Sequence, residues 1–192
     1  MTHYTDAEIK QKLKELVVIT DSREQVHQHI ISWLDKHNIQ HKSRALETGD
    51  YSVMLGDTTF EDEVVVERKA NLDEIAGNFT SGRERFEREM IRAKAGGIKI
   101  FLIVENASWT DIFLHNYRSD LKPQSFAATL LSWQARFNLT ITFCTPSETA
   151  QILSSTLYYW VSDRLKRGWG YGHGLCYPKP TYRPAGGRAL WV

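Results

Sequence analysis

Residues 64–69 constrain this chain more than any other segment, because they join a buried strand to a run of charges. Three valines are followed directly by Glu67, Arg68 and Lys69. Consecutive β-branched residues are typical of a strand inside a core, and charged groups are costly to place there. Since side chains alternate along a strand, Glu67 and Lys69 are expected on one face of a sheet and Arg68 on the other. The pattern predicts a carboxylate and an ammonium group together at the rim of the core.

A carboxylate beside a lysine suits hydrolysis of a phosphodiester. The carboxylate can hold a divalent cation, and the lysine can orient or deprotonate a water and offset phosphate charge. The cation needs a second acid, and Asp50 opens the preceding apolar run. Residues 56–62 between the two runs are rich in turn formers, which predicts an antiparallel hairpin. Folding the hairpin about residues 58 and 59 places Asp50 near Glu67.

Several short motifs resemble those of one nuclease family. Residues 67–73 resemble the ERKxxxD signature of the XPF-type structure-specific DNA endonucleases. The other similar motifs follow in the family's order: D-x-R-E at residues 21–24, GDY at 49–51, NGR at 81–83 with serine in place of asparagine, an apolar strand ending in glutamate at 98–105, and a Ser/Thr-Ala segment entering a late helix at 145–150. The likeness extends from about residue 17 to about residue 165.

The resemblance implies an α/β fold, the three-layer α/β/α restriction-endonuclease-like type with a mixed central sheet. It implies an endonuclease that depends on Mg2+ or Mn2+ and hydrolyses branched, flapped or junction DNA, as in DNA repair or recombination. The expected catalytic residues are Asp50, Glu67, Lys69, Arg68, Asp21 and Asp73, of which Asp50, Glu67 and Asp21 are the expected metal ligands. The residues expected to contact DNA are Arg23, Glu24, Arg83, Arg85, Lys166, Arg167 and Trp169.

Some of these residues also have local explanations, which stay open at this point. Asp21 can cap the helix that follows it, and Asp73 lies in a first helical turn, where the helix dipole favours an acid. The helix of residues 81–94 alternates in charge, which is typical of a solvated face held by pairs three or four residues apart. Against that, Arg83 next to a glycine at the helix start can bind a phosphate together with backbone N–H groups.

The remaining pattern predicts strands that alternate with helices. The expected strands are residues 16–19, an edge strand at 43–46, 51–55, 64–69, 98–104 and 139–143. The expected helices are residues 5–15, 25–37, 72–79, 81–94, 123–137 and 147–166. The last helix has an apolar face broader than a small sheet requires, so part of it is expected to form a homodimer surface. His27, His29, His37 and His41 lack the spacing of metal ligands and are expected on the surface.

The composition, with 42% hydrophobic and 24% charged residues, is that of a soluble globular protein. A length of 192 residues fits one nuclease domain, residues 1–166, and a basic, aromatic, Gly/Pro-rich tail, residues 167–192. The tail's composition does not build a core; it suits either wrapping along single-stranded DNA or covering a partner subunit. In relatives this place often holds a helix-hairpin-helix module, whose turn motif this tail lacks.

Neither a span of ~20 apolar residues nor a signal-peptide core is present, so a cytoplasmic location is expected, at the nucleoid in a bacterial or viral setting or in the nucleus of a eukaryote. Cys144 and Cys176 are expected to be free thiols. A net charge of +1 does not by itself indicate a nucleic-acid partner. Two alternatives to this nuclease are an inactive DNA-binding or scaffolding subunit, which would lack a metal ligand or the lysine, and a sequence-specific restriction-type enzyme of the same fold.

Overall fold

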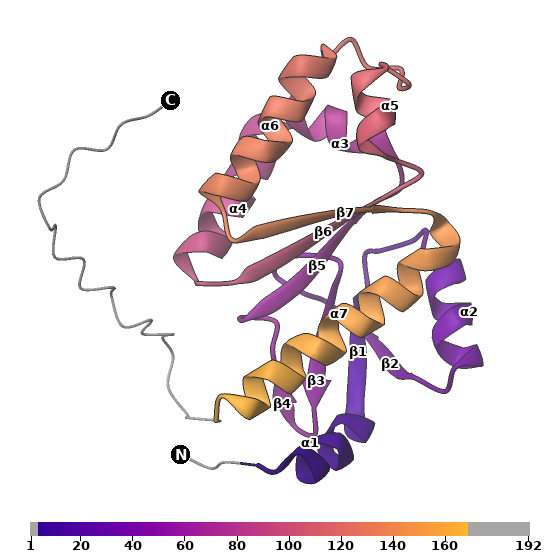
Figure 1. Ribbon diagram of the computed structural model, residues 1–192, viewed down its shortest axis with the longest axis vertical. Coiled ribbons are helices and arrows are strands. Elements are labelled where there is room, and N and C mark those ends of the chain that lie inside the picture. Colours follow the sequence, from indigo (N-terminus) through magenta and orange to yellow (C-terminus); the bar gives the residue numbers. More distant parts are fainter. Residues whose placement is uncertain (1–3, 169–192) are drawn as a thin grey trace, which may run out of the picture.

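The computed structural model describes residues 4–168, which form one mixed β-sheet between two layers of helices (Figure 1). The strands are β1 (Leu16–Asp21), β2 (Gln40–Arg44), β3 (Tyr51–Leu55), β4 (Thr58–Thr59), β5 (Val64–Lys69), β6 (Lys99–Glu105) and β7 (Leu139–Cys144). The α-helices are α1 (Asp6–Lys12), α2 (Gln28–Lys36), α3 (Leu72–Phe79), α4 (Arg83–Ala95), α5 (Trp109–Phe113), α6 (Pro123–Arg136) and α7 (Pro146–Lys166). A short 3-10 turn, η1 (Leu13–Glu15), joins α1 to β1.

The sheet has the strand order β2-β1-β3-β5-β6-β7, with β4 paired to β3. Strands β5, β6 and β7 run parallel and are joined by helical crossovers, whereas β3 is antiparallel to both β1 and β5. Tyr51 pairs with Val66, as expected for the hairpin, but the predicted turn at residues 58 and 59 was wrong: the turn lies at Gly56 and Asp57, and residues 58 and 59 form β4 opposite Met54 and Leu55. This register brings the residue before β3, Asp50, to the end of β5. The mixed α/β/α architecture that the motifs implied is confirmed.

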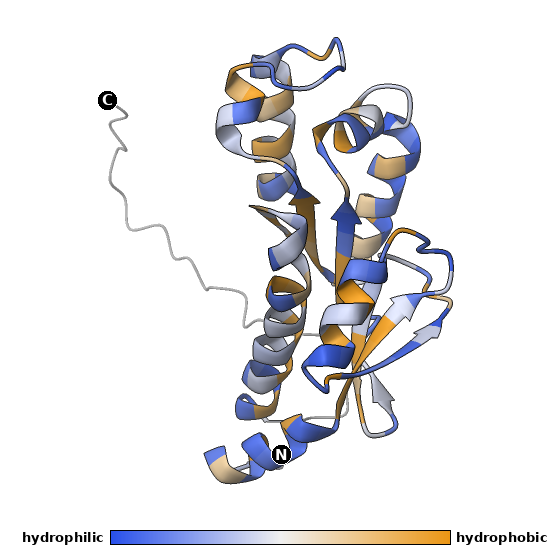
Figure 2. Ribbon diagram, turned by 90° about the vertical axis from the view of Figure 1, so that its right-hand side faces the viewer, coloured by the Kyte–Doolittle hydropathy of each residue, from blue (hydrophilic) through white to orange (hydrophobic). Residues whose placement is uncertain are grey.

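The three valines of β5 divide between two hydrophobic cores. Val64 and Val66 pack in the core under α1, α2 and α7, whereas Val65 packs in the core under α3, α4 and α6. Figure 2 shows hydrophobic residues along the central strands and both hydrophobic and hydrophilic residues on the helices. Because side chains alternate, the same strand turns Glu67 and Lys69 toward α3 and α4, and Arg68 toward α2 and α7.

Several predicted element boundaries were wrong. The first helix, predicted at residues 5–15, ends at Lys12, and the first strand reaches Asp21. The second strand covers Gln40–Arg44, not residues 43–46, because it pairs in parallel with the whole of β1, from Val17 opposite Gln40 to Asp21 opposite Arg44. The second helix begins at Gln28 instead of residue 25. The residues before it form a turn in which the Glu24 N–H donates to the Asp21 carbonyl at 3.0 Å. This turn presents Arg23 and Glu24 at the rim of the sheet.

Gly49 is required by the close approach of the hairpin strands. Its φ is +74°, and a Cβ there would lie 2.8 Å from the Val65 Cβ. We expect Gly49→Ala to lower the free energy of unfolding by about 2–4 kcal/mol, from backbone strain and overpacking together. Gly56→Ala is the matched control, because Gly56 also has a positive φ but has no atom within 4 Å of such a Cβ. Urea denaturation measures both; an equal loss in the two variants would show that the contact with Val65 is unimportant.

Within residues 4–168, no helix is both long and apolar enough to cross a membrane. Cys144 is buried and free, as expected. Cys176, Trp169 and all of the tail beyond residue 168 lie outside the described residues, so the expectations for them stay predictions.

Candidate functional site

Asp50 lies at the rim of the sheet, at the end of β5. Its backbone N–H donates to the Val66 carbonyl at 2.9 Å, and its Oδ2 accepts the Arg68 N–H at 2.7 Å. The carboxylate is half-buried and is held by the main chain of the strand that carries Glu67. The two segments that the sequence placed together by hairpin register are therefore joined by hydrogen bonds on both sides of residue 67.

Glu67 and Lys69 form an ion pair on the same face of the sheet. The Lys69 Nζ lies 2.7 Å from a Glu67 carboxylate oxygen, and the two side chains are only 11% and 14% exposed. The same Nζ lies 3.4 Å from Glu74 in α3 and 5.7 Å from the centre of the Phe86 ring in α4. The Lys69 ammonium is thus enclosed by two carboxylates and an aromatic ring, which fix its position and favour its charged form.

The site is short of positive charge. Burial and the negative charge of Glu67 raise the pKa of Asp50 to about 8. Burial also raises the pKa of Glu67, although Lys69 opposes the shift. Burial would lower the pKa of Lys69, but the attraction of Glu67 outweighs it and the net shift is upward. One ammonium therefore faces three acids, Asp50, Glu67 and Glu74, and the pKa values of Asp50 and Glu67 are both raised.

This donor set fits a hard divalent cation. A cation between Asp50 and Glu67 would replace the proton that burial and repulsion place on Asp50. Residues 4–168 contain no group of three or more His, Cys, Asp or Glu residues arranged to hold a metal. Mg2+, however, usually binds to one or two carboxylates and completes its shell with water and substrate phosphates, and Mn2+ prefers similar oxygen ligands. Asp50 and Glu67 are therefore suited to Mg2+ or Mn2+ in the presence of a phosphodiester.

Asp21, also predicted as a metal ligand, is buried and its carboxylate is engaged by Arg23. It accepts the Arg23 N–H at 3.0 Å and the Arg23 Nε at 2.9 and 3.1 Å. Burial opposes ionisation, but these hydrogen bonds give Asp21 a lowered pKa. The Asp21 main chain contacts Asp50 through an N–H to carbonyl bond of 2.7 Å. Since α2 begins at Gln28, the alternative that Asp21 caps that helix is wrong.

Asp73 lies in the first turn of α3 and holds the loop between α5 and α6. Its carboxylate accepts the Arg118 N–H at 2.6 Å, the Arg118 Nε at 2.9 Å and the Ser119 N–H at 3.3 Å. Hydrogen bonds from Arg118 lower the pKa of Asp73. These contacts engage the Asp73 carboxylate with the loop after α5, and its catalytic role stays a prediction.

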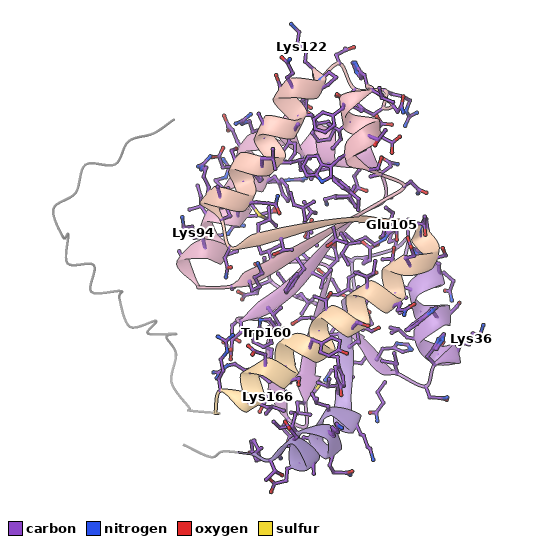
Figure 3. The ribbon with its side chains drawn as sticks, viewed as in Figure 1. Lys36, Lys94, Glu105, Lys122, Trp160 and Lys166 are labelled. Atoms are coloured by element: carbon purple, nitrogen blue, oxygen red, sulfur yellow. The ribbon has the colours of Figure 1, made fainter. Side chains whose placement is uncertain are left out.

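The residues predicted to contact DNA lie in three places, the first being the turn after β1, where Arg23 pairs with Asp21 and Glu24 with Arg68. Arg83 and Arg85 are exposed on α4, the helix that covers Lys69, and Arg83 lies 3.9 Å from Glu87. Lys166 and Arg167 lie at the other end of the molecule, at the end of α7, near Asp6 and Asp163 respectively. Figure 3 shows Glu105 and Lys166 at opposite ends of α7, whose 21 residues span about 30 Å. The structure therefore places the α4 arginines and Arg23, which pairs with Asp21, on the side of the molecule that carries the acids, and Lys166 and Arg167 away from it.

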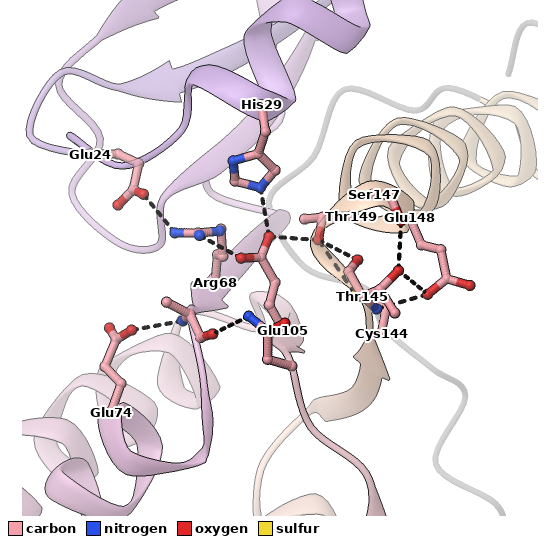
Figure 4. Close-up of polar contacts among 12 residues, drawn as sticks. Glu24, His29, Arg68, Glu74, Glu105, Cys144, Thr145, Ser147, Glu148 and Thr149 are labelled. Atoms are coloured by element: carbon pink, nitrogen blue, oxygen red, sulfur yellow. Dashed lines mark hydrogen bonds and ion pairs between the residues drawn. The ribbon is translucent and has the colours of Figure 1, made fainter.

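A buried polar cluster behind the site was not predicted. Arg68 binds Glu105 at 2.5 Å and Glu24 at 3.1 Å, and Glu105 also accepts hydrogen bonds from Thr149 at 2.6 Å and contacts His29 at 2.8 Å (Figure 4). His29, expected on the surface, is 33% exposed, and its ring reaches Glu105. Strand alternation indicated the face to which Arg68 points. Its partners follow from helix packing, for which the sequence has no short-range signal.

The chain was compared with known proteins. Residues 20–156 match the family model of the ERCC4 domain. XPF from Aeropyrum pernix is similar in structure, with a TM-score of 0.56 and 23% sequence identity over 88% of this chain and 70% of that chain. A structure of XPF from Aeropyrum pernix in complex with DNA has a TM-score of 0.56 and 21% identity over 77% of this chain and 66% of that chain. None of the curated proteins matches.

Proposed function

Since this chain belongs to the ERCC4 domain family of XPF-type nucleases, we propose that it is an active, metal-dependent endonuclease that cuts branched or junction-containing DNA. The observation that carries the proposal is the placement of Asp50 and Glu67 at one rim with Lys69 paired to Glu67 at 2.7 Å. Two acids of raised pKa beside a fixed ammonium are typical of a metal-assisted hydrolytic site.

In the proposed mechanism, Asp50 and Glu67 would hold Mg2+ or Mn2+. When bound, the cation supplies Lewis-acid polarisation of the phosphate and a lowered pKa for the attacking water. Lys69 keeps its proton, because Glu67 raises its pKa, so it acts by donating a hydrogen bond to the water or the phosphate. Of the two roles open to this lysine, orientation is therefore favoured over deprotonation.

The proposed path of the DNA crosses the face of α4. Arg83 and Arg85 are exposed there, and Phe86 of the same helix covers the Lys69 ammonium. Arg23, with a side chain that is 69% exposed next to Asp21, borders the other side of Asp50. Guanidinium groups on both sides of the acids suit a phosphate backbone, which repels the acids themselves.

Cleavage of a set of DNA substrates tests this proposal against its two rivals. Purified protein is incubated with flap, fork, four-way-junction, single-stranded and linear duplex DNA in Mg2+ or Mn2+. We expect cuts that follow the junction when its sequence is changed. Cuts at one sequence in linear duplex would indicate a restriction-type enzyme, and DNA binding without cleavage under all of these conditions would indicate a scaffolding subunit. Retention of Asp50, Glu67 and Lys69 favours the active enzyme.

Metal binding should depend on pH through Asp50. A cation must displace the proton that Asp50 keeps up to a pH of about 8, so the apparent affinity for Mn2+ should rise by up to about tenfold per pH unit below that value and level off above it. Calorimetric titration of Mn2+ between pH 6 and pH 9 measures this. An affinity that is constant over this range would contradict the assignment of Asp50 as a ligand.

We also propose a homodimer through α7. Phe101 in β6 and Ile152, Tyr159 and Trp160 in α7 line one apolar surface depression, and Tyr159 is 71% exposed. A second copy would remove this surface from water. Tyr159→Arg should convert a dimer to a monomer in light scattering coupled to gel filtration. Leu131→Arg, at a 53% exposed position on α6, is the control and should leave the mass unchanged; a monomeric wild-type protein would contradict the proposal.

A further inference from the structure

Arg68 points to the face of the sheet opposite to Glu67 and Lys69. There its guanidinium is held by Glu24 and Glu105 (Figure 4). Its guanidinium is 5% exposed and donates from Nη2 to Glu105 at 2.5 Å and from Nη1 to Glu24 at 3.1 Å. Glu105 is itself only 2% exposed, and its second oxygen accepts the Thr149 hydroxyl at 2.6 Å. The same oxygen contacts His29 Nε2 at 2.8 Å. Both partners of the central ion pair are therefore fixed by further contacts.

The main chain of Arg68 belongs to the candidate site although its side chain does not. Its N–H donates to Asp50 Oδ2 at 2.7 Å, and its two neighbours in the chain are Glu67 and Lys69. A rotation of this one residue would therefore displace all three functional groups. Successive side chains of a strand point to opposite faces. Contacts that hold the Arg68 guanidinium on one face therefore fix the directions of the Glu67 carboxylate and the Lys69 ammonium on the other face.

Stability alone explains this cluster poorly. Buried ion pairs seldom stabilise a fold more than apolar residues of the same volume, and here, within residues 4–168, Arg68 Nε is buried without a hydrogen-bond partner. Glu24 and Glu105 also bring two negative charges to one guanidinium. Unlike apolar packing, this arrangement fixes the orientation of the Arg68 side chain, because charge-assisted hydrogen bonds are strongly directional.

We propose that Glu105 is a positioning residue for the metal site, acting through Arg68 on Asp50, Glu67 and Lys69. The inference rests on the proposed function, because it assigns Glu105 a role in metal binding without contact with the metal. Hydrogen-bonding partners behind the ligands of a metal site commonly change its affinity or activity by about 10–100-fold when they are altered.

The test is Glu105→Gln, which keeps the shape of the side chain and removes its charge. We expect its Mn2+ affinity, measured by calorimetric titration, to fall by about 10–100-fold with a parallel loss of cleavage, at a temperature where circular dichroism shows the variant folded. Glu63→Gln is the matched control, because Glu63 pairs with Arg164 at 2.9 Å next to the opposite end of β5. Its Mn2+ affinity should equal that of the wild type.

Thr149→Val is the second variant and serves where Glu105→Gln fails to fold. It retains every charge and removes one hydrogen bond to Glu105, so the Mn2+ affinity should fall less than in Glu105→Gln, yet measurably. If folded Glu105→Gln binds Mn2+ as tightly as the wild type, the inference is overturned and the proposed function is intact. If Glu105→Gln does not fold, the same result in Thr149→Val has the same meaning. A wild-type protein that neither binds Mn2+ nor cleaves DNA overturns both.

Discussion

Asp50→Asn is expected to lose DNA cleavage by a factor of about 10³ or more and to be more stable than the wild-type protein at pH 8 in the absence of metal. The first effect follows because an amide is a much poorer ligand than a carboxylate, and metal assistance contributes several kcal/mol to the barrier of such reactions. The amide oxygen can still accept the Arg68 N–H that Asp50 accepts at 2.7 Å, so the hairpin should be preserved.

The gain in stability follows from the raised pKa of Asp50. Its folded pKa of about 8 lies above the ordinary value of 3.8, so between these values the folded protein holds a proton that the unfolded chain releases. The free energy of unfolding of the wild type therefore falls as the pH rises through this window. Asparagine does not ionise and is spared this loss. The gain in free energy of unfolding of the variant over the wild type should be largest at and above pH 8. Each kcal/mol of this gain should raise the melting temperature by about 2–4 °C.

Thermal melts in EDTA at pH 5 and pH 8, together with cleavage assays in Mn2+, measure both effects. Asp57→Asn is the matched control, because Asp57 is an exposed acid in the turn of the same hairpin; it should cleave like the wild type and show no pH-dependent gain. Cleavage at the wild-type rate by Asp50→Asn would remove Asp50 from the proposed site. A melting difference that does not change with pH would contradict its raised pKa.

The position of Asp50 opposite Glu67 could be predicted because a hairpin leaves few choices. The turn formers at residues 56–62 set its centre, and a side-chain period of two then decides which residues share a face. Tyr51 pairs with Val66, so the expected segments meet, although the turn lies at residues 56 and 57 and not at 58 and 59. The alternation of Glu67, Arg68 and Lys69 follows from the same period. Local geometry thus accounts for the part of the site in which chemistry is expected.

The cluster around Arg68 could not be predicted, because it depends on how helices distant in sequence pack at the end of β6. His29 reaches Glu105 from 76 positions away, and Thr149 reaches it from 44 positions away. No periodic pattern relates such residues. Asp73 illustrates the opposite difficulty: its motif position suggested the catalytic site, but its carboxylate holds Arg118, 45 residues later. A motif indicates which residues occur together, whereas packing decides what each of them contacts.

Lys69→Met should separate metal binding from cleavage. The change removes the ammonium that lies 2.7 Å from Glu67 and leaves two acids that still attract a cation, so the Mn2+ affinity should equal or exceed that of the wild type.

Cleavage by Lys69→Met should fall by about 10²–10³, the usual effect of losing one donor to a developing charge. Without metal, the unpaired Glu67 should destabilise the fold by about 3–5 kcal/mol, and Mn2+ should restore part of this.

Calorimetric titration, cleavage assays and denaturation in EDTA or Mn2+ test these expectations. Lys99→Met is the matched control, because Lys99 is a partly buried strand lysine whose Nζ bonds Thr140 at 2.7 Å at the opposite end of the sheet; it should keep wild-type cleavage. If Lys69→Met lost Mn2+ binding in proportion to cleavage, the lysine would serve to build the metal site instead of orienting the water or phosphate. The Lys69 ammonium already lies between Glu67 and Glu74. If Lys69 orients the water or the phosphate, the metal ion must therefore bind Glu67 on a side that the ammonium does not occupy.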